Sequence, residues 1–203
     1  EKFGSFDFKA NAYHKNYETN KHITLLTNDV VWNPSSNITK GGFVNSLGGM
    51  IRNRNYEAKK TTDYKTAGTV NELSSVLTYK SSLPMQKKGI NFSNTFTPNF
   101  MIRYAPNHMR NLGGDDITLK YANLYSINKT SEIENGLSAI LGFEFRKNEK
   151  GEDGSEKEKL SISMGQVFSP KRNEDMPTKS SLDQKMSDVV GEIDYNFSKI
   201  GKI

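Results

Sequence analysis

The chain has 203 residues, of which only 34% are hydrophobic and 25% are charged, with a formal net charge of +5 and no cysteine. No apolar run approaches the roughly 18 residues that a spanning helix needs, and without cysteine neither a disulfide nor a thiolate metal site can form within these residues. Because basic and acidic residues are interspersed, nucleic acid is excluded as a partner, while the basic excess still allows an acidic lipid or a phosphorylated glycolipid.

Turn-forming and charged clusters divide the chain into short stretches of strand-like residues, and we expect eight to ten strands. Within them, Gly48 and Gly49 predict a bulge or a sharp bend. Residues 84–89 are expected to form a turn, and residues 177–187 could form a helical turn in a loop. The predicted strands cover residues 5–12, 23–32, 41–56, 72–80, 92–104, 117–125, 137–146, 160–168 and 188–197.

Two of these strands divide their side chains cleanly between two faces. Successive residues of a strand point to opposite sides, so alternation along the sequence predicts which residues share a face. The apolar face holds Leu137, Leu141, Phe143, Phe145, Val189, Ile193 and Tyr195. The opposite, polar face holds Glu144, Arg146, Glu192 and Asp194.

No stretch between the strands shows helical periodicity, so hairpins explain the pattern better than helical crossovers. The sequence therefore predicts an all-β fold, an antiparallel up-and-down meander. An apolar face repeated over many strands, with charge on the other face, is typical of an outer-membrane β-barrel wall. Four tyrosines near predicted strand ends suit the lipid headgroup level, although strand propensity alone would also explain them: Tyr79, Tyr104, Tyr125 and Tyr195.

Several short motifs occur in order between residues 92 and 197. They are Pro98 with Tyr104-Ala-Pro106, Asp115-Asp116-Ile117, Leu124-Tyr125-Ser126, Asn135-Gly136-Leu137, Ser163-Met-Gly165-Gln166-Val167, and the tail from Met176 to Phe197. Each motif is weak alone, but together they resemble the C-terminal barrel region of the lipopolysaccharide-assembly protein LptD family, also called organic solvent tolerance proteins. One departure is that the family's Gly-x-Asp-Arg element is replaced here by residues 129–134.

The resemblance implies that residues 1–203 are one partial barrel domain, without a signal peptide or a periplasmic domain, in the outer membrane of a Gram-negative cell. It implies transport of lipopolysaccharide to the outer leaflet, without catalysis and without a cofactor. It also implies an LptE-like lipoprotein plug inside the barrel and a periplasmic bridge of Lpt proteins as partners. We expect the sheet to be open, because too few strands are present to close a large barrel.

Prolines and glycines mark the structural positions of the motif series, which also includes Tyr104, Asp116 and Gly136. Pro98 and Pro106 cannot donate to a strand ladder, so they indicate strand boundaries or, alternatively, weakened pairing of the kind tied in this family to lateral opening. Strict alternation after Gly165 places Gln166 on the apolar face. Its amide then needs a position at the membrane boundary, which we favour, or a bulge that turns it inward.

Catalytic and metal motifs are not found in the sequence. His14, His22 and His108 lie in polar, turn-like contexts, and the acidic residues of 152–158 lack the order of a calcium loop. The sequence therefore predicts neither an enzyme nor a metal site. The candidates for attracting an anionic cargo are cations expected on the polar face: Lys9, Lys80, Arg103, Lys120 and Arg146.

Two rival interpretations share part of this evidence. Another outer-membrane barrel, such as a diffusion porin or a receptor, would have the same two-faced strands and differ only in the motif series. A secreted, soluble β-sandwich that acts as a binding module would instead bury the apolar faces in a dry core.

Overall fold

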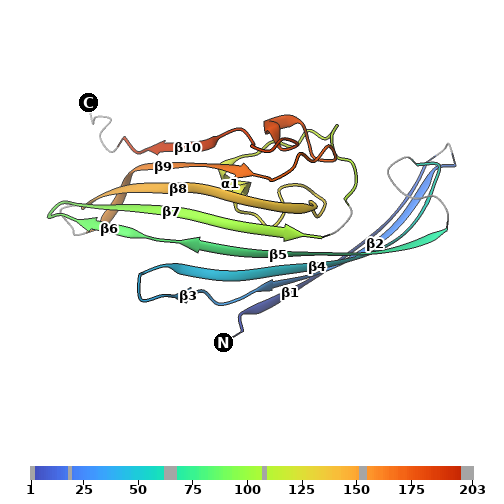
Figure 1. The fold of residues 1–203 in the computed structure, drawn as a ribbon, viewed down its shortest axis with the longest axis horizontal. Helices are drawn as coiled ribbons and strands as arrows, with labels where there is room; N and C mark the ends of the chain where they lie inside the picture. The colour runs from blue at the N-terminus through green and yellow to red at the C-terminus, as the bar shows by residue number, and fades with distance from the viewer. Residues whose placement is uncertain (1–2, 18–19, 62–67, 107–108, 151–154, 198–203) are drawn as a thin grey trace, which may run out of the picture.

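The computed structural model describes residues 3–17, 20–61, 68–106, 109–150 and 155–197, which form one large antiparallel sheet (Figure 1). The strands are β1 (Ser5–Asn16), β2 (His22–Asn33), β3 (Asn37–Ile38), β4 (Val44–Lys59), β5 (Thr69–Ser82), β6 (Met85–Lys88), β7 (Phe92–Ala105), β8 (Gly136–Lys150), β9 (Glu156–Phe168) and β10 (Val190–Tyr195). Helical structure in these residues is limited to α1 (Tyr121–Leu124) and the 3-10 turn η1 (Lys179–Ser181).

The strands follow one another across the sheet in the order β1-β2-β4-β5-β7-β8-β9-β10. The short strand β3 pairs with β4, and β6 pairs with β7. All pairs are antiparallel, and β1 and β10 lie at opposite edges of the sheet, which is not closed (Figure 1). The predicted all-β, up-and-down, open meander is therefore confirmed.

Three local predictions were wrong. Residues 85–88 of the expected turn form β6, because they pair with Ser93–Phe96 of β7. The bulge allowed at Gly48 and Gly49 is contradicted, because the pairing of β4 runs through both without a shift, and a register shift lies between Lys147 and Asn148 instead. Residues 117–125 form no strand but a loop that contains α1.

Strand register divides the sheet into an outer and an inner face, as the alternation predicted. Cross-strand partners point to the same side, so the paired Phe96 and Phe145 share the outer face while Met101 and Ile140 share the inner face. The outer face carries large apolar side chains that nothing covers in the described structure, including Phe8, Ile51, Leu77, Leu141 and Ile193. Among the residues that the structure describes, no second sheet packs on them, in contrast to a β-sandwich.

Two loops cover part of the inner face. The inner loop (residues 109–135) connects β7 to β8, and the second loop (residues 169–189) connects β9 to β10, so both leave the same end of the sheet (Figure 1). Their apolar residues pack on Met101 of β7, Ile140 of β8 and Val167 of β9, which belong to the inner face. The loop residues of this cluster are Met109, Leu112, Leu119, Leu124, Met176 and Leu182. The two loops also join each other, since the Leu112 amide donates to the Asp175 carbonyl over 2.7 Å. In the described residues, no helix is long and apolar enough to cross a membrane.

Candidate functional site

Helix α1 lies against the sheet at a pair of glycines. Gly142 of β8 and Gly165 of β9 are direct partners, and both expose bare backbone to the inner loop. A Cβ on Gly142 would lie 2.5 Å from the Tyr125 hydroxyl, and one on Gly165 would meet the Leu124 side chain closer still. The Gly-Gln motif therefore has a packing reason: only glycine lets the inner loop approach the wall this closely.

We expect Gly165→Val to lower the free energy of unfolding by about 1–3 kcal/mol, the usual cost of overpacking a filled site. The β-branched side chain would push Leu124 out of its position on β9. Denaturant unfolding in detergent, followed by the fluorescence of the single tryptophan, measures the change. Gly114→Val is the matched control, since no atom lies within 4 Å of its Cβ position. Equal stability of the two variants would contradict the packing role.

Ion pairs join the inner loop to β4 and β5, and a further ion pair links β4 to β2. Arg52 binds Asp29 in a bidentate manner, with nitrogen–oxygen distances of 2.7 and 2.9 Å, and donates to the Ser131 carbonyl over 2.8 Å. Arg54 donates to Glu132 over 2.6 Å. Arg110 of the loop lies 2.7 Å from Glu72 of β5 and 3.4 Å from Glu132.

This network holds three cations and three carboxylates. The Glu72 carboxylate also accepts a hydrogen bond from Tyr56, whose ring lies 5.4 Å from the Arg110 guanidinium. Partly buried pairs are stronger than exposed ones, and the bidentate pair of Arg52 with Asp29 also fixes the geometry of the network. The charges within the network are balanced, so its role is to position the loop on the wall.

Arg103 of β7 anchors the loop's C-terminal half. Its side chain is almost fully buried and donates to the carbonyls of Ile127 and Glu134 over 2.6 and 2.7 Å, and to the Asn128 side chain over 2.7 Å. The Glu134 carboxylate lies 4.0 Å from its Nε. Arg103 was predicted to be a cation in the lumen, but it is a structural anchor of the loop.

The segment of residues 129–134 folds around Glu134. Its carboxylate accepts hydrogen bonds from the backbone amides of Lys129 and Thr130. The Lys129 Nζ lies 3.8 Å from the same carboxylate, is buried, and finds no hydrogen-bond partner in the described part of the chain. Arg103 of the wall and the Glu134 carboxylate of the loop thus hold this segment. Together with Lys129 they form a group of two cations and one carboxylate.

Burial shifts the pKa values of several groups in the inner loop. Desolvation raises the pKa of Tyr121 to about 12. The Glu144 carboxylate, which accepts a hydrogen bond from the Tyr121 hydroxyl over 3.1 Å, adds to the shift. Desolvation also raises the pKa of Tyr125 and lowers the pKa of Lys129. It raises the pKa of Glu132 as well, although the nearby Arg54 acts in the opposite direction. Both phenols therefore stay protonated at physiological pH, and the Tyr121 hydroxyl donates to Glu144, whereas the Tyr125 hydroxyl is buried without a hydrogen-bond partner in the described residues.

The other predicted cations lie in different surroundings. Register places Lys9, Lys80 and Arg146 on the inner face, and all three are exposed. Arg146 lies 3.2 Å from Glu144 and 3.9 Å from Glu158, so it is paired locally. Lys120 is exposed on the inner loop just before α1, rather than on a strand as expected.

The two prolines differ in position, since Pro98 lies inside β7 and Pro106 lies at the end of that strand. Pro106 follows the last residue of β7. Pro98 pairs with Phe143 of β8, and on its other side its carbonyl accepts from Leu83, at the junction where the partner of β7 changes from β6 to β5. A strand residue directs its nitrogen and its carbonyl to the same side, so the missing donor faces this junction and no bond to β8 is lost.

The remaining motif residues have identifiable roles. Gln166 pairs with Leu141 on the outer face without a bulge, and its amide donates to the Ser187 carbonyl over 2.6 Å. The second loop therefore satisfies this side chain. Gly136 begins β8 with a φ of +97°, which L side chains rarely adopt.

Two motif positions differ from expectation. Asp116 pairs with Lys179 of the second loop and starts no strand. Tyr104 is half exposed on the outer face beside Leu137, as a girdle residue requires, but Tyr125 is a loop residue that stacks edge-on with Tyr121 and cannot belong to a girdle.

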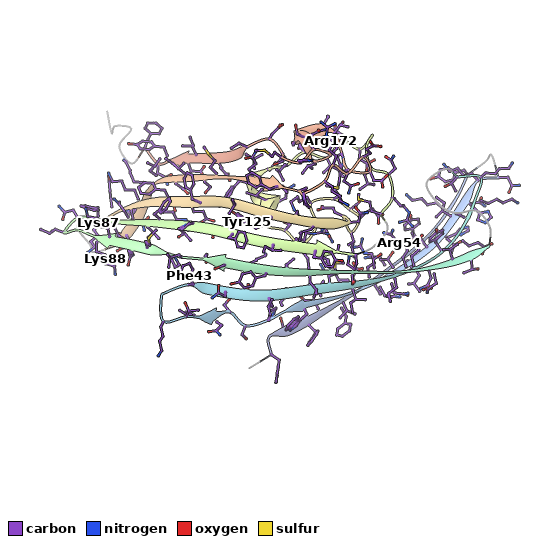
Figure 2. The ribbon with its side chains drawn as sticks, in the orientation of Figure 1. Phe43, Arg54, Lys87, Lys88, Tyr125 and Arg172 are labelled. Atoms are coloured by element: carbon purple, nitrogen blue, oxygen red, sulfur yellow. The ribbon has the colours of Figure 1, made fainter. Side chains whose placement is uncertain are left out.

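Sequence reasoning missed the residues that hold the loop, above all Arg52, Arg54 and Glu132. Figure 2 labels three residues of the region where the loops cover the inner face. They are Arg54 of β4, Tyr125 of the inner loop, which lies over the middle of β8 in this view, and Arg172 of the second loop. The spacing of Tyr121, Leu124 and Tyr125 follows a helix rather than a strand, and this signal could have identified α1.

No cluster of metal-binding side chains occurs in the described residues. His14 and His22, predicted in a turn, lie on the paired strands β1 and β2 with ring centroids 6.4 Å apart. His108 and the acidic residues 152 and 153 lie outside the described residues.

Comparison with protein families gives one match. The family model described as LPS transport system D matches residues 2–200, which is nearly the whole chain. No curated protein matches the sequence.

Proposed function

Since the chain belongs to the LPS transport system D family, which acts in lipopolysaccharide transport at the outer membrane, we propose that its sheet is part of the barrel wall that delivers lipopolysaccharide to the outer leaflet. The observation that carries the proposal is the separation of the two faces. The outer face is apolar and exposed over the length of the sheet, while the inner face carries charged residues and is partly covered by loops. A lipid-facing barrel wall needs this arrangement.

The direction of the sheet follows from its loops. Outer-membrane barrels have short periplasmic turns and long extracellular loops. The connections at the end of the sheet that carries the inner loop and the second loop include the two longest in the chain. We therefore assign this end to the cell surface, so that the two loops fold back into the lumen from outside.

The partners in this proposal are those that membership of the family implies. Residues 1–203 would form one partial barrel domain, with an LptE-like lipoprotein inside the complete barrel and a periplasmic bridge of Lpt proteins that supplies the cargo. No step in this role requires a bond to be made or broken by the chain itself, so we assign it no catalysis and no cofactor.

A diffusion porin remains the second candidate, because its wall has the same two faces. Loops packed on the inner face of β7, β8 and β9 favour the transport barrel, since they fill lumen that a pore needs. Single-channel recording of the complete protein in planar bilayers separates the two functions. We expect little conductance, and a large, stable conductance would favour a porin.

The exposed cations of the inner face and of the inner loop provide a test of the transport function. Lys9, Lys80, Lys120 and Arg146 would attract phosphorylated cargo over a distance, without a defined binding site. Single replacements should change lipopolysaccharide delivery by less than about twofold, as for other exposed charges. Reversing all four to Glu should slow delivery by about tenfold, because long-range attraction sums over charges.

The measurement is surface labelling of newly made lipopolysaccharide in cells that depend on the variant barrel. The control exchanges Lys and Arg at the same four positions, which keeps the charge and the number of substitutions. Heat-modifiable mobility on gels shows that both barrels assemble. Normal delivery by the barrel with all four charges reversed would contradict the electrostatic part of the mechanism. If the unsubstituted barrel assembles well but delivers no lipopolysaccharide, the proposed function itself is contradicted.

A further inference from the structure

A cavity lies between the inner loop, the second loop and the ends of β7, β8 and β9. Its volume is about 280 Å³, enough for several water molecules of about 30 Å³ each. Four of the residues that line it carry positive charge, Arg103, Lys129, Lys171 and Arg172, while one, Glu134, carries negative charge. Arg172 and Lys171 are exposed at the rim, whereas Arg103 and Lys129 are buried.

The buried part of this cavity is not electrically balanced. Arg103 gives its donors to the inner loop, and Glu134 gives Oε1 to the loop amides, so one carboxylate oxygen, Oε2, faces both the Lys129 Nζ at 3.8 Å and the Arg103 Nε at 4.0 Å. The Lys129 Nζ is buried without a hydrogen-bond partner in the described residues. A buried ammonium group that shares one carboxylate with a second cation and makes no hydrogen bond is costly, and its ordinary remedies are a further counterion or loss of its proton.

Neutral hydrogen-bonding groups complete the lining. Asn135 and Asn173 hydrogen-bond each other over 2.7 Å across the two loops, and Ser138 and Ser169 also line the cavity. Cationic, amide and hydroxyl groups that converge on one small space form a favourable environment for an oxyanion.

We propose that this cavity is a binding site for a phosphate group, held by Lys129 from inside and by Arg172 and Lys171 at the rim. A bound phosphate would supply the negative charge that the cluster of Arg103, Lys129 and Glu134 lacks. If the proposed transport function holds, the phosphate belongs to lipopolysaccharide near the cell-surface end of the barrel; free inorganic phosphate offers the same chemistry.

The test measures equilibrium binding to the complete protein, purified with its membrane partners in detergent. The probes are lipopolysaccharide, the same lipopolysaccharide with its phosphates removed, and inorganic phosphate followed by ³¹P resonance broadening. We expect wild-type protein to prefer the phosphorylated form by about tenfold, the value of one good charge-assisted bond. Lys129→Met and Arg172→Met should each lose most of this preference.

Lys120→Met is the matched control, since Lys120 is an exposed lysine of the same loop that does not line the cavity. Arg172→Met removes an exposed side chain, so its result does not depend on the folding of a buried position. The preference should survive the Lys120 change. If inorganic phosphate competes with lipopolysaccharide, the site reads the phosphate group alone; if it does not, the site reads the phosphate within the lipid.

Equal binding of the two lipopolysaccharides by wild-type protein, or a preference untouched by both cavity variants, would overturn the proposal. Failure of the transport function gives a different result, namely no binding of either lipopolysaccharide. In that case the phosphate resonance decides: broadening that Lys129→Met abolishes supports the site, and no broadening refutes it.

Discussion

Replacing Arg103 by Met is expected to release the C-terminal half of the inner loop from the wall, at a cost of about 3–5 kcal/mol in the free energy of unfolding. The change removes three hydrogen bonds to the loop and leaves two buried carbonyl groups without these donors. Buried acceptors that lose their partners retain the full cost of desolvation.

Limited proteolysis of the folded barrel measures the release, because a detached loop becomes a substrate while the strands stay protected. Arg146→Met is the matched control: the same substitution on the same face removes an exposed arginine, and the expected cost is below about 1 kcal/mol. Arg103→Lys should give an intermediate result, since a lysine keeps the charge but cannot reach three acceptors in a fixed plane. A protease-resistant loop in Arg103→Met would contradict the anchoring role.

An arginine on the outer face should impair membrane insertion. Leu141 and Ile193 are 50% and 71% exposed on the face assigned to lipid, so Leu141→Arg and Ile193→Arg each place a charge on that face. The expected cost is about 2–4 kcal/mol near the bilayer midplane and less toward the interfaces. Folding into vesicles of defined thickness, followed by the heat-modifiable band on gels, measures it.

The neighbouring residue provides the control for this prediction. Glu192 precedes Ile193 on β10 and points to the opposite face, so Glu192→Arg adds arginine at nearly the same depth without contact with lipid. We expect Glu192→Arg to insert normally. If Glu192→Arg were as harmful as Ile193→Arg, the assignment of the two faces would be wrong.

The faces could be predicted from the sequence because alternation is a local property of each strand. Leu137, Leu141 and Ile193 share the outer face for the same reason that Glu144 and Glu192 share the inner face. The order of the strands followed from the absence of helical connections. Strand pairing therefore needed no knowledge of distant contacts.

The inner loop could not be predicted in this way. Ile117, Leu119 and Tyr121 alternate as in a strand, but Leu119 is buried against other parts of the loops and the wall. Arg103 has the spacing of an exposed lumen residue, and only the fold of residues 127–134, which are far away in sequence, makes it an anchor. Such residues depend on tertiary contacts, which override local pattern.

The contacts of the inner loop also determine which strands can move apart. The loop is bonded to Arg52 and Arg54 of β4, to Glu72 of β5 and to Arg103 of β7, and it is packed on Gly142 of β8 and Gly165 of β9. It therefore crosses five adjacent strands as a transverse brace. Separation of any two of them would break contacts with the brace as well as the ladder, so an opening for an acyl chain would form more readily between strands that the loop does not bridge.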